Sequence, residues 1–303
     1  MPLVLATPAS GSQSSEDALE PRLMTWTGFD GSIWQLTRPA ATNPRMGRGV
    51  KGLHMPPVEV FSSATPLVPG VDLLGYSLPE RPVYWPLLFK ASTAEQWETE
   101  HAAFMDSFHP VELGTWTVGK GEKARTLQLR GAFNGDHSFA RDPFVTGLAW
   151  IGLELYAPRP LWRGKPIRQT FFADEPVDFI PTEPGDVYHP SPDASFATAT
   201  IVNPGNEPAY LRWEVQGPQD ELRLGVGGAV IEVPFEVPDG STLIIDTDPA
   251  GQYATLDGVD CNEDLGFQMF APVPGRGATP LTITSSGSGS VTAELVPLYW
   301  RAF

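Results

Sequence analysis

The sequence has few of the residues that most often perform chemistry. Its 303 residues include one cysteine, Cys261, and five histidines. A single cysteine excludes an intramolecular disulfide and a Cys-based metal site. No histidine lies within five residues of another, which excludes H-x-H and H-E-x-x-H sites, and no G-x-S-x-G motif occurs. We therefore predict no catalytic residue, no cofactor and no metal site.

Long apolar runs are also missing. No stretch of about 18 apolar residues occurs, so neither a transmembrane helix nor membrane insertion is predicted. Residues 1–9 lack the basic and apolar regions of a secretory signal. The polar, serine-rich stretch that follows predicts a flexible N-terminal arm over residues 1–22.

Basic residues are scarce in the second half. Up to Arg163 there are 14 basic and 16 acidic residues, and from Gly164 onward there are 6 basic and 20 acidic residues. An acidic surface repels phosphate, which argues against nucleic-acid binding by the second half. Charged residues make up 18% of the chain, while 30 Gly, 32 Pro and 11% aromatic residues favour a β-rich protein with many loops.

Short runs of alternating apolar and polar residues are separated by Gly and Pro residues, which predicts a mainly β fold with two β-sandwich-like domains. Strands are predicted in the first half at residues 32–37, 58–61, 82–89, 115–118, 126–133 and 145–156. Strands are predicted in the second half at residues 197–202, 209–216, 228–237, 242–246, 252–256, 281–284 and 291–295. The 82–89 run is apolar almost throughout, which is typical of a strand buried on both faces. Turns are predicted at Asn203-Pro204-Gly205 (type II, with Gly at positive φ) and at Asp257-Gly258.

One segment follows a helical period instead. Ser92 and Glu95 form a capping box, and Pro110 ends the apolar pattern. We predict an amphipathic helix over about residues 93–107 that lies across a sheet, with His101 as a half-buried core histidine. Its apolar face comprises Trp97, His101, Phe104 and Phe108.

The chain divides near residues 163–166. Pro158-Arg159-Pro160 and Gly164-Lys165-Pro166 are typical of a linker, and the charge balance changes there. We predict an N-terminal β domain with one helix over residues 23–163 and an acidic C-terminal β-sandwich over residues 164–303.

Several motifs match a functional pattern without its context. Residues 47–52 match G-x-G-x-x-G, but prolines replace the strand and helix that dinucleotide binding needs, so a flexible basic loop is predicted. Residues 114–120 match most of a P-loop, but Gly121 replaces the Mg²⁺-binding hydroxyl, so a strand and hairpin are predicted. Calcium could bind at Asp246-Thr247-Asp248 or within residues 257–264, although Pro249 and Gly258 favour ordinary turns.

Two surface questions stay open at this stage. The nine tryptophans could include a sugar-stacking platform, although Trp213 and Trp300 are predicted to lie in a core. The basic loop with Arg45, Arg48 and Lys51 is either solvated or in contact with an acidic neighbour.

The second half resembles the C-terminal domain of siphophage distal tail proteins. Three blocks carry the resemblance: residues 201–210 (IVNPGNEPAY) running to Trp213 and Gly217-Pro218, residues 243–249 (LIIDTDP) with Asp257-Gly258 beyond, and residues 298–303 (LYWRAF). The first half is similar to the family's N-terminal domain in having residues 30–36 (DGSIWQL) near its start and one helix among strands.

The resemblance implies a structural virion protein, not an enzyme, at the tip of a non-contractile phage tail. It implies a ring, usually a homohexamer, closed by the N-terminal domains, with galectin-like C-terminal domains projecting outward. The implied partners are other copies of the chain, the tail tube protein, the tail-tip hub protein and the tape measure protein, with DNA passing through the lumen in transit. A ring of this kind needs heterologous interfaces that close by rotation.

Two alternatives remain. The C-terminal sandwich could be a carbohydrate-binding or adhesion module that recognises a host surface glycan. A hydrolase is the other alternative, because paired carboxylates for glycoside hydrolysis meet only in the fold.

Overall fold

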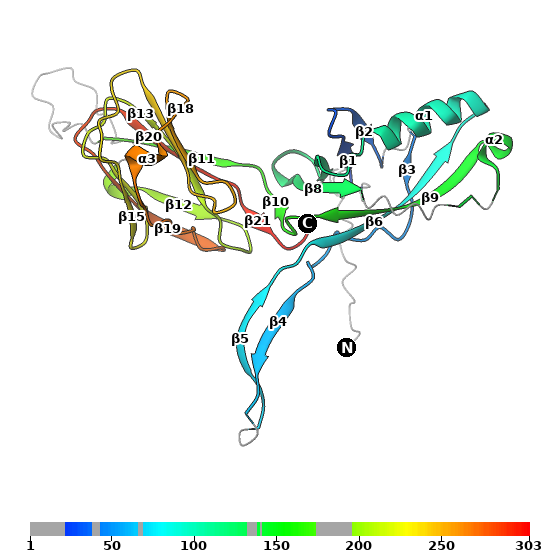
Figure 1. Cartoon of the computed structure of the whole chain (residues 1–303), viewed down its shortest axis with the longest axis horizontal. Coiled ribbons are helices and arrows are strands. Elements are labelled where there is room, and N and C mark those ends of the chain that lie inside the picture. The colour runs from blue at the N-terminus through cyan, green and yellow to red at the C-terminus, as the bar shows by residue number, and fades with distance from the viewer. Residues whose placement is uncertain (1–21, 38–42, 66–68, 132–137, 140, 174–195) are drawn as a thin grey trace, which may run out of the picture.

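The computed structural model describes residues 22–37, 43–65, 69–131, 138–139, 141–173 and 196–303, so the predicted arm lies outside the described residues except for Arg22. Strands dominate, which confirms the mainly β fold class. The described residues form two bodies side by side, and a two-stranded hairpin leaves the N-terminal body (Figure 1).

The N-terminal body is built on a sheet with the strand order β2-β1-β7-β8-β9-β6-β3, to which β10 adds on β8. Its strands are β1 (Met24–Thr27), β2 (Ile33–Gln35), β3 (Arg45–Met46), β6 (Arg81–Lys90), β7 (Gly114–Val118), β8 (Arg125–Gly131), β9 (Leu148–Ala157) and β10 (Trp162–Arg163). Its helices are α1 (Ala94–Asp106) and α2 (Pro143–Thr146), with a 3₁₀ turn at Gly121–Lys123.

A chain of tryptophans fills the core of this body. The centroid of the Trp85 ring lies 5.5 Å from that of Trp26 and 5.2 Å from that of Trp116, and both contacts are edge-on. The ring centroids of Trp116 and Trp162 lie 5.0 Å apart. Edge-to-face contacts of this kind add about 0.5–1.5 kcal/mol each to the free energy of area burial. The rings therefore join β1, β6, β7 and β10 in one hydrophobic cluster.

The amphipathic helix packs on this core, as predicted. Trp97 and Phe104 are buried, and half-buried His101 stacks on Trp97 with ring centroids 4.6 Å apart. The prediction of the cap was wrong by one residue, because the Thr93 side chain, not that of Ser92, accepts the hydrogen bond from the Gln96 amide.

Two predicted strands of this body need correction. Strand β6 is buried on one face only: Val83, Trp85, Leu87 and Phe89 are buried, while the residues between them are partly or fully exposed. Strand β9 begins at Leu148, because Asp142 caps α2 and Gly147 ends it at φ +62°. Residues 145–147 therefore belong to a helical turn.

The C-terminal body is a β-sandwich. One sheet has the order β11-β20-β13-β16-β17-β18 and the other β12-β19-β14-β15. Its strands are β11 (Ile167–Phe172), β12 (Thr200–Asn203), β13 (Leu211–Gln216), β14 (Arg223–Val226), β15 (Ala229–Glu232), β16 (Thr242–Asp246), β17 (Tyr253–Leu256), β18 (Val259–Asp260), β19 (Gly277–Thr284) and β20 (Ser290–Leu295). A 3₁₀ turn spans Phe196–Thr198, and the short helix α3 spans Asn262–Leu265.

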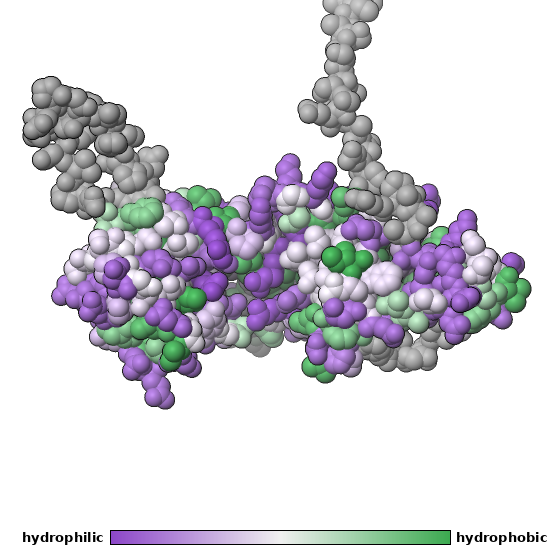
Figure 2. Space-filling model, turned by 90° about the horizontal axis from the view of Figure 1, so that it is seen from above, coloured by the Kyte–Doolittle hydropathy of each residue, from purple (hydrophilic) through white to green (hydrophobic). Residues whose placement is uncertain are grey.

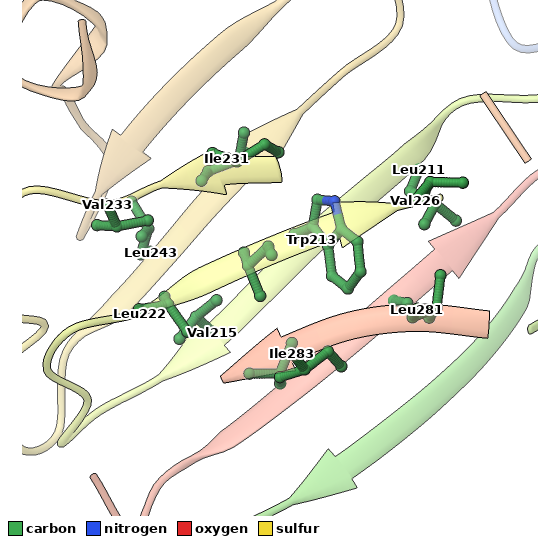
Figure 3. Packing of buried hydrophobic residues seen from close by; sticks show 14 of the residues in the cluster. Leu211, Trp213, Val215, Leu222, Val226, Ile231, Val233, Leu243, Leu281 and Ile283 are labelled. Carbon is green, nitrogen blue, oxygen red and sulfur yellow. The ribbon is translucent and has the colours of Figure 1, made fainter. Parts of the chain in front are cut away.

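The two sheets enclose the second hydrophobic cluster. Trp213 on β13 points between the layers toward Leu281 and Ile283 of β19 (Figure 3). It is 1% exposed, which confirms the prediction of a core tryptophan. The hairpin turn at Asp257-Gly258 is also confirmed, since both residues have positive φ between β17 and β18.

Among the described helices, none has the length and apolarity that a membrane span requires.

Candidate functional site: assembly surfaces

A hairpin without a covering layer is the most exposed apolar feature of the N-terminal body. Strands β4 (Glu59–Ser63) and β5 (Asp72–Ser77) pair only with each other among the described strands, and they project away from the sheet (Figure 1). Val60 faces Tyr76 across the hairpin, so these two side chains share one face and neighbouring Phe61 points to the other. The exposed apolar side chains are Val58, Val60, Phe61, Val71, Leu73, Leu74 and Tyr76.

This exposure is a functional signal. Isolated two-stranded hairpins are marginally stable in water, and contiguous exposed apolar patches mark interaction sites. Leu73 and Leu74 are each 69% exposed. The alternation at residues 58–61 predicted β4, whereas no strand was predicted at β5; the apolar residues after Pro69-Gly70 are the sequence signal for it.

Arg81 holds the base of the hairpin. Its guanidinium donates to four backbone oxygens: those of Gly52 (2.7 Å), His54, Pro160 (2.6 Å) and Trp300 (2.8 Å). The side chain is 1% exposed, and burial lowers its pKa to about 10, so it remains protonated at neutral pH. One buried cation thus connects the 52–54 loop, the linker and the end of the chain. No local sequence motif predicts this role of Arg81.

The last residues return to the N-terminal body. Strand β21 (Leu298–Tyr299) pairs with β10, and buried Ala302 joins the first hydrophobic cluster, where its amide donates to Leu53 O. The Phe303 ring lies 3.7 Å from the Arg22 guanidinium carbon. The segment 298–303 therefore returns to the N-terminal body after the whole sandwich, although Leu298 also packs against the hydrophobic cluster of the sandwich.

The 203–208 turn is hydrogen-bonded to this returning segment. Asn206 and Glu207 donate their amides to Leu298 O, and Asn206 Oδ1 accepts from the Trp300 amide (3.2 Å). The Glu207 carboxylate accepts from the Trp300 indole and lies 3.4 Å from the Tyr76 hydroxyl. The negative charge of Glu207 raises the pKa of Tyr76. Two of the three sequence blocks that carried the family resemblance thus meet at the joint between the bodies.

Trp300 is half-buried at this joint rather than in a core, so the prediction for it was wrong. The type II turn prediction was also wrong, because Gly205 is absent from the glycines with positive φ. A side chain there is excluded by space: a Cβ on Gly205 would lie 2.7 Å from Leu298 O and 2.8 Å from Leu298 N.

We expect Gly205→Ala to destabilise the protein by about 1–3 kcal/mol, because the added methyl group pushes the returning strand away. Differential scanning calorimetry measures the change. Gly228→Ala is the control, since a Cβ there meets nothing within 4 Å. Equal unfolding temperatures for the two variants would contradict the assignment.

A second exposed surface lies on the outer side of β3, β6 and β9. The strand register places Arg45, Leu88 and Trp150 in one cross-strand row, and the isolated bridge between Lys51 and Tyr84 adds another row. Trp150 is 58% exposed, and Leu148 beside Lys90 is 42% exposed. We call this surface the outer face; it comprises Arg45, Lys51, Tyr84, Leu88, Lys90, Leu148, Trp150 and Glu154.

The G-x-G-x-x-G segment forms the edge of the outer face. Gly47 donates to Pro86 O and Lys51 to Tyr84 O, so the segment is bound to β6 and the prediction of a loop that is merely flexible was wrong. A Cβ on Gly47 would lie 2.6 Å from Trp150, and one on Gly52 would lie 2.7 Å from Val83. These glycines serve close packing, and the described residues that follow them, 53–65, contain no helix that could bind a phosphate.

The other candidate motifs form ordinary structure. Residues 114–118 are β7, followed by the predicted turn at Gly119. Asp246 and Asp248 accept backbone amides in a turn, and Asp248 pairs with Arg159 at 3.5 Å. Within the described ranges, no group of three or more His, Cys, Asp and Glu side chains is arranged to hold a metal ion.

A cleft of about 510 Å³ separates the linker from the sandwich. Its charged side chains come from both bodies, and the Arg159–Asp248 pair spans it. Figure 2 shows hydrophilic and apolar residues interspersed over both bodies, with apolar residues also at the end of the N-terminal body where α2 lies; Phe144 and Val145 are exposed there.

No family model and no curated protein matches this sequence. Solved structures do match. The first is the Dit (gp 19.1) protein of SPP1, described as a paradigm of the hub adsorption apparatus in phages that infect Gram-positive bacteria; it has a TM-score of 0.64 and 13% identity over 92% of this chain and 99% of that one. The chain has the fold of the SPP1 Dit protein.

Two structures of the phage P2 baseplate in its activated conformation, with Ca and with Sr, also match. Their TM-scores are 0.50 and 0.51, each at 11% identity over 91% of this chain and 98% of the other. The Dit-like fold therefore covers both bodies and the joint between them, and it confirms at the level of fold the resemblance that the sequence blocks indicated.

Proposed function

We propose that this chain is a structural component of the tip of a non-contractile phage tail. It forms a ring, a homohexamer, that joins the tail tube to the tail-tip hub and keeps a channel open for the tape measure protein and DNA. The observation that carries the proposal is the Dit-like fold over 92% of the chain. The uncovered hairpin supports it, because the hairpin needs a partner surface.

The two bodies have different roles in this proposal. Residues 23–163 with the returning segment 298–303 form the ring, and the acidic sandwich projects outward. The second half of the chain, which forms the sandwich, has 6 basic and 20 acidic residues, and this net negative charge favours a solvated position. Arg81 and Glu207 fix the joint between the two.

Labelling of intact particles tests this role. An antibody against the sandwich is expected to mark the tail tip, and chemical cross-linking is expected to connect the chain to the tube and hub proteins. Label along the tube or on the capsid would contradict the proposal.

The carbohydrate-binding alternative lacks a tryptophan platform in the sandwich. Trp213 is buried, and the Trp300 indole is hydrogen-bonded to Glu207 at the joint. The prediction that the chain is not an enzyme stays a prediction.

A further inference from the structure

The hairpin and the outer face differ in charge. Residues 58–77 contain two acidic residues, Glu59 and Asp72, and no Lys or Arg. The outer face has three cations, Arg45, Lys51 and Lys90, against one anion, Glu154. Charge complementarity of this kind steers association and fixes the register of an interface.

The two surfaces also match in their apolar content. Exposed Phe61 lies on the face of β4 that also carries Glu59, two residues earlier, and the outer face presents exposed Trp150 and Leu148. Both are sheet faces, and two sheets stack about 10 Å apart when their side chains interdigitate. Aromatic residues and Arg are enriched in protein interfaces, and both occur on the outer face.

One chain does not bring the two surfaces together. The hairpin leaves the body near the start of β6 and points away from the sheet, while Leu148 and Trp150 lie toward the opposite end of β6, where Lys90 pairs with Leu148 (Figure 1). Two complementary patches at different places on one chain give a heterologous contact, and such contacts generate rings when the rotation closes.

We propose that the β4–β5 hairpin of one copy packs on the outer face of the next copy, with Glu59 and Asp72 near Arg45, Lys51 and Lys90. This proposal rests on the proposed ring, and it specifies which two surfaces of neighbouring copies are in contact there. The hairpin supplies an apolar layer over Trp150, and the outer face supplies the covering that the hairpin lacks.

Single cysteines test the contact directly. The chain has one native cysteine, Cys261, which is buried, and burial raises the pKa of its thiol. Cys261→Ala removes this thiol, so the introduced cysteines are the only groups that a maleimide can link. In that background, Phe61→Cys combined with Leu148→Cys is expected to give a covalent ladder of oligomers with a short bismaleimide in assembled tips. Each single variant alone is expected to give none, because a heterologous contact does not place like residues together.

A matched control pairs Phe61→Cys with Val202→Cys, since Val202 is 54% exposed on the sandwich. No ladder is expected from it. A ring seen by electron microscopy that lacks the Phe61–Leu148 ladder would overturn the contact and leave the ring standing. Cross-linking of Phe61→Cys to the tube protein instead would also overturn it. The absence of any ring would overturn the proposed function itself.

Charge reversal gives a second measurement. Lys51→Glu is expected to lower the yield of rings about tenfold, the effect of roughly 1.4 kcal/mol. Adding Glu59→Lys on the hairpin is expected to restore the yield, because the opposite charges meet again. A Glu59→Lys change that further lowers the yield would contradict the pairing.

Discussion

Replacement of Arg81 by methionine is expected to lower the free energy of unfolding by about 3–5 kcal/mol, because four backbone carbonyl oxygens lose the charged donor that the buried Arg81 side chain supplies. The side chain keeps most of its volume, so the loss comes from hydrogen bonds rather than from a cavity. Arg81→Lys is expected to recover little, since one ammonium cannot reproduce the planar fork that reaches Gly52, Pro160 and Trp300. Denaturant unfolding followed by tryptophan fluorescence measures both.

The control for this prediction is Arg130→Met. Arg130 pairs with Glu80 at 3.3 Å, but both side chains are more than 40% exposed, and exposed ion pairs contribute about 0–1 kcal/mol. If the Arg81→Met and Arg130→Met variants unfold at the same denaturant concentration, the hydrogen bonds from Arg81 to Gly52, Pro160 and Trp300 do not stabilise the fold.

Phe61→Asp combined with Leu73→Asp is expected to abolish incorporation into tail tips while leaving the monomer folded. Both side chains are more than 50% exposed in the single chain, so the charges cost the monomer little. In an interface each change buries a carboxylate where an apolar side chain should pack, which costs several kcal/mol. Quantitative blotting of purified particles, alongside circular dichroism of the isolated protein, measures the two effects.

Val111→Asp is the matched control, because Val111 is 77% exposed on the N-terminal body outside the hairpin. Normal incorporation is expected for it. Normal incorporation of the hairpin variant would show that the exposed apolar side chains have no role in assembly.

Local sequence patterns predicted most of the single elements. Alternation identified β7, β13 and β20, and the 3.6-residue period identified α1, because these patterns report which side chains share a face. The pattern around Trp213 therefore correctly indicated a core. The same reasoning placed Trp300 in a core, since periodicity does not reveal where a returning strand ends.

The joint and the candidate assembly surfaces were not predicted, for a physical reason. Arg81 and Trp300 are 219 residues apart, and nothing near either residue encodes their hydrogen bond. The Gly205 site likewise depends on a strand more than ninety residues later, so turn statistics gave it the wrong role. The exposure of β4 could not be predicted, because a strand shows the same alternation of apolar and polar residues whether or not another layer covers it.

A reconstruction of the intact tail tip by electron cryo-microscopy tests the central claim most directly. The account predicts copies of this chain arranged around an open axis between the tube and the hub, with each hairpin covered by its neighbour and each sandwich on the outside. A map in which the chain sits outside any ring, with β4 and β5 exposed to solvent, would contradict it.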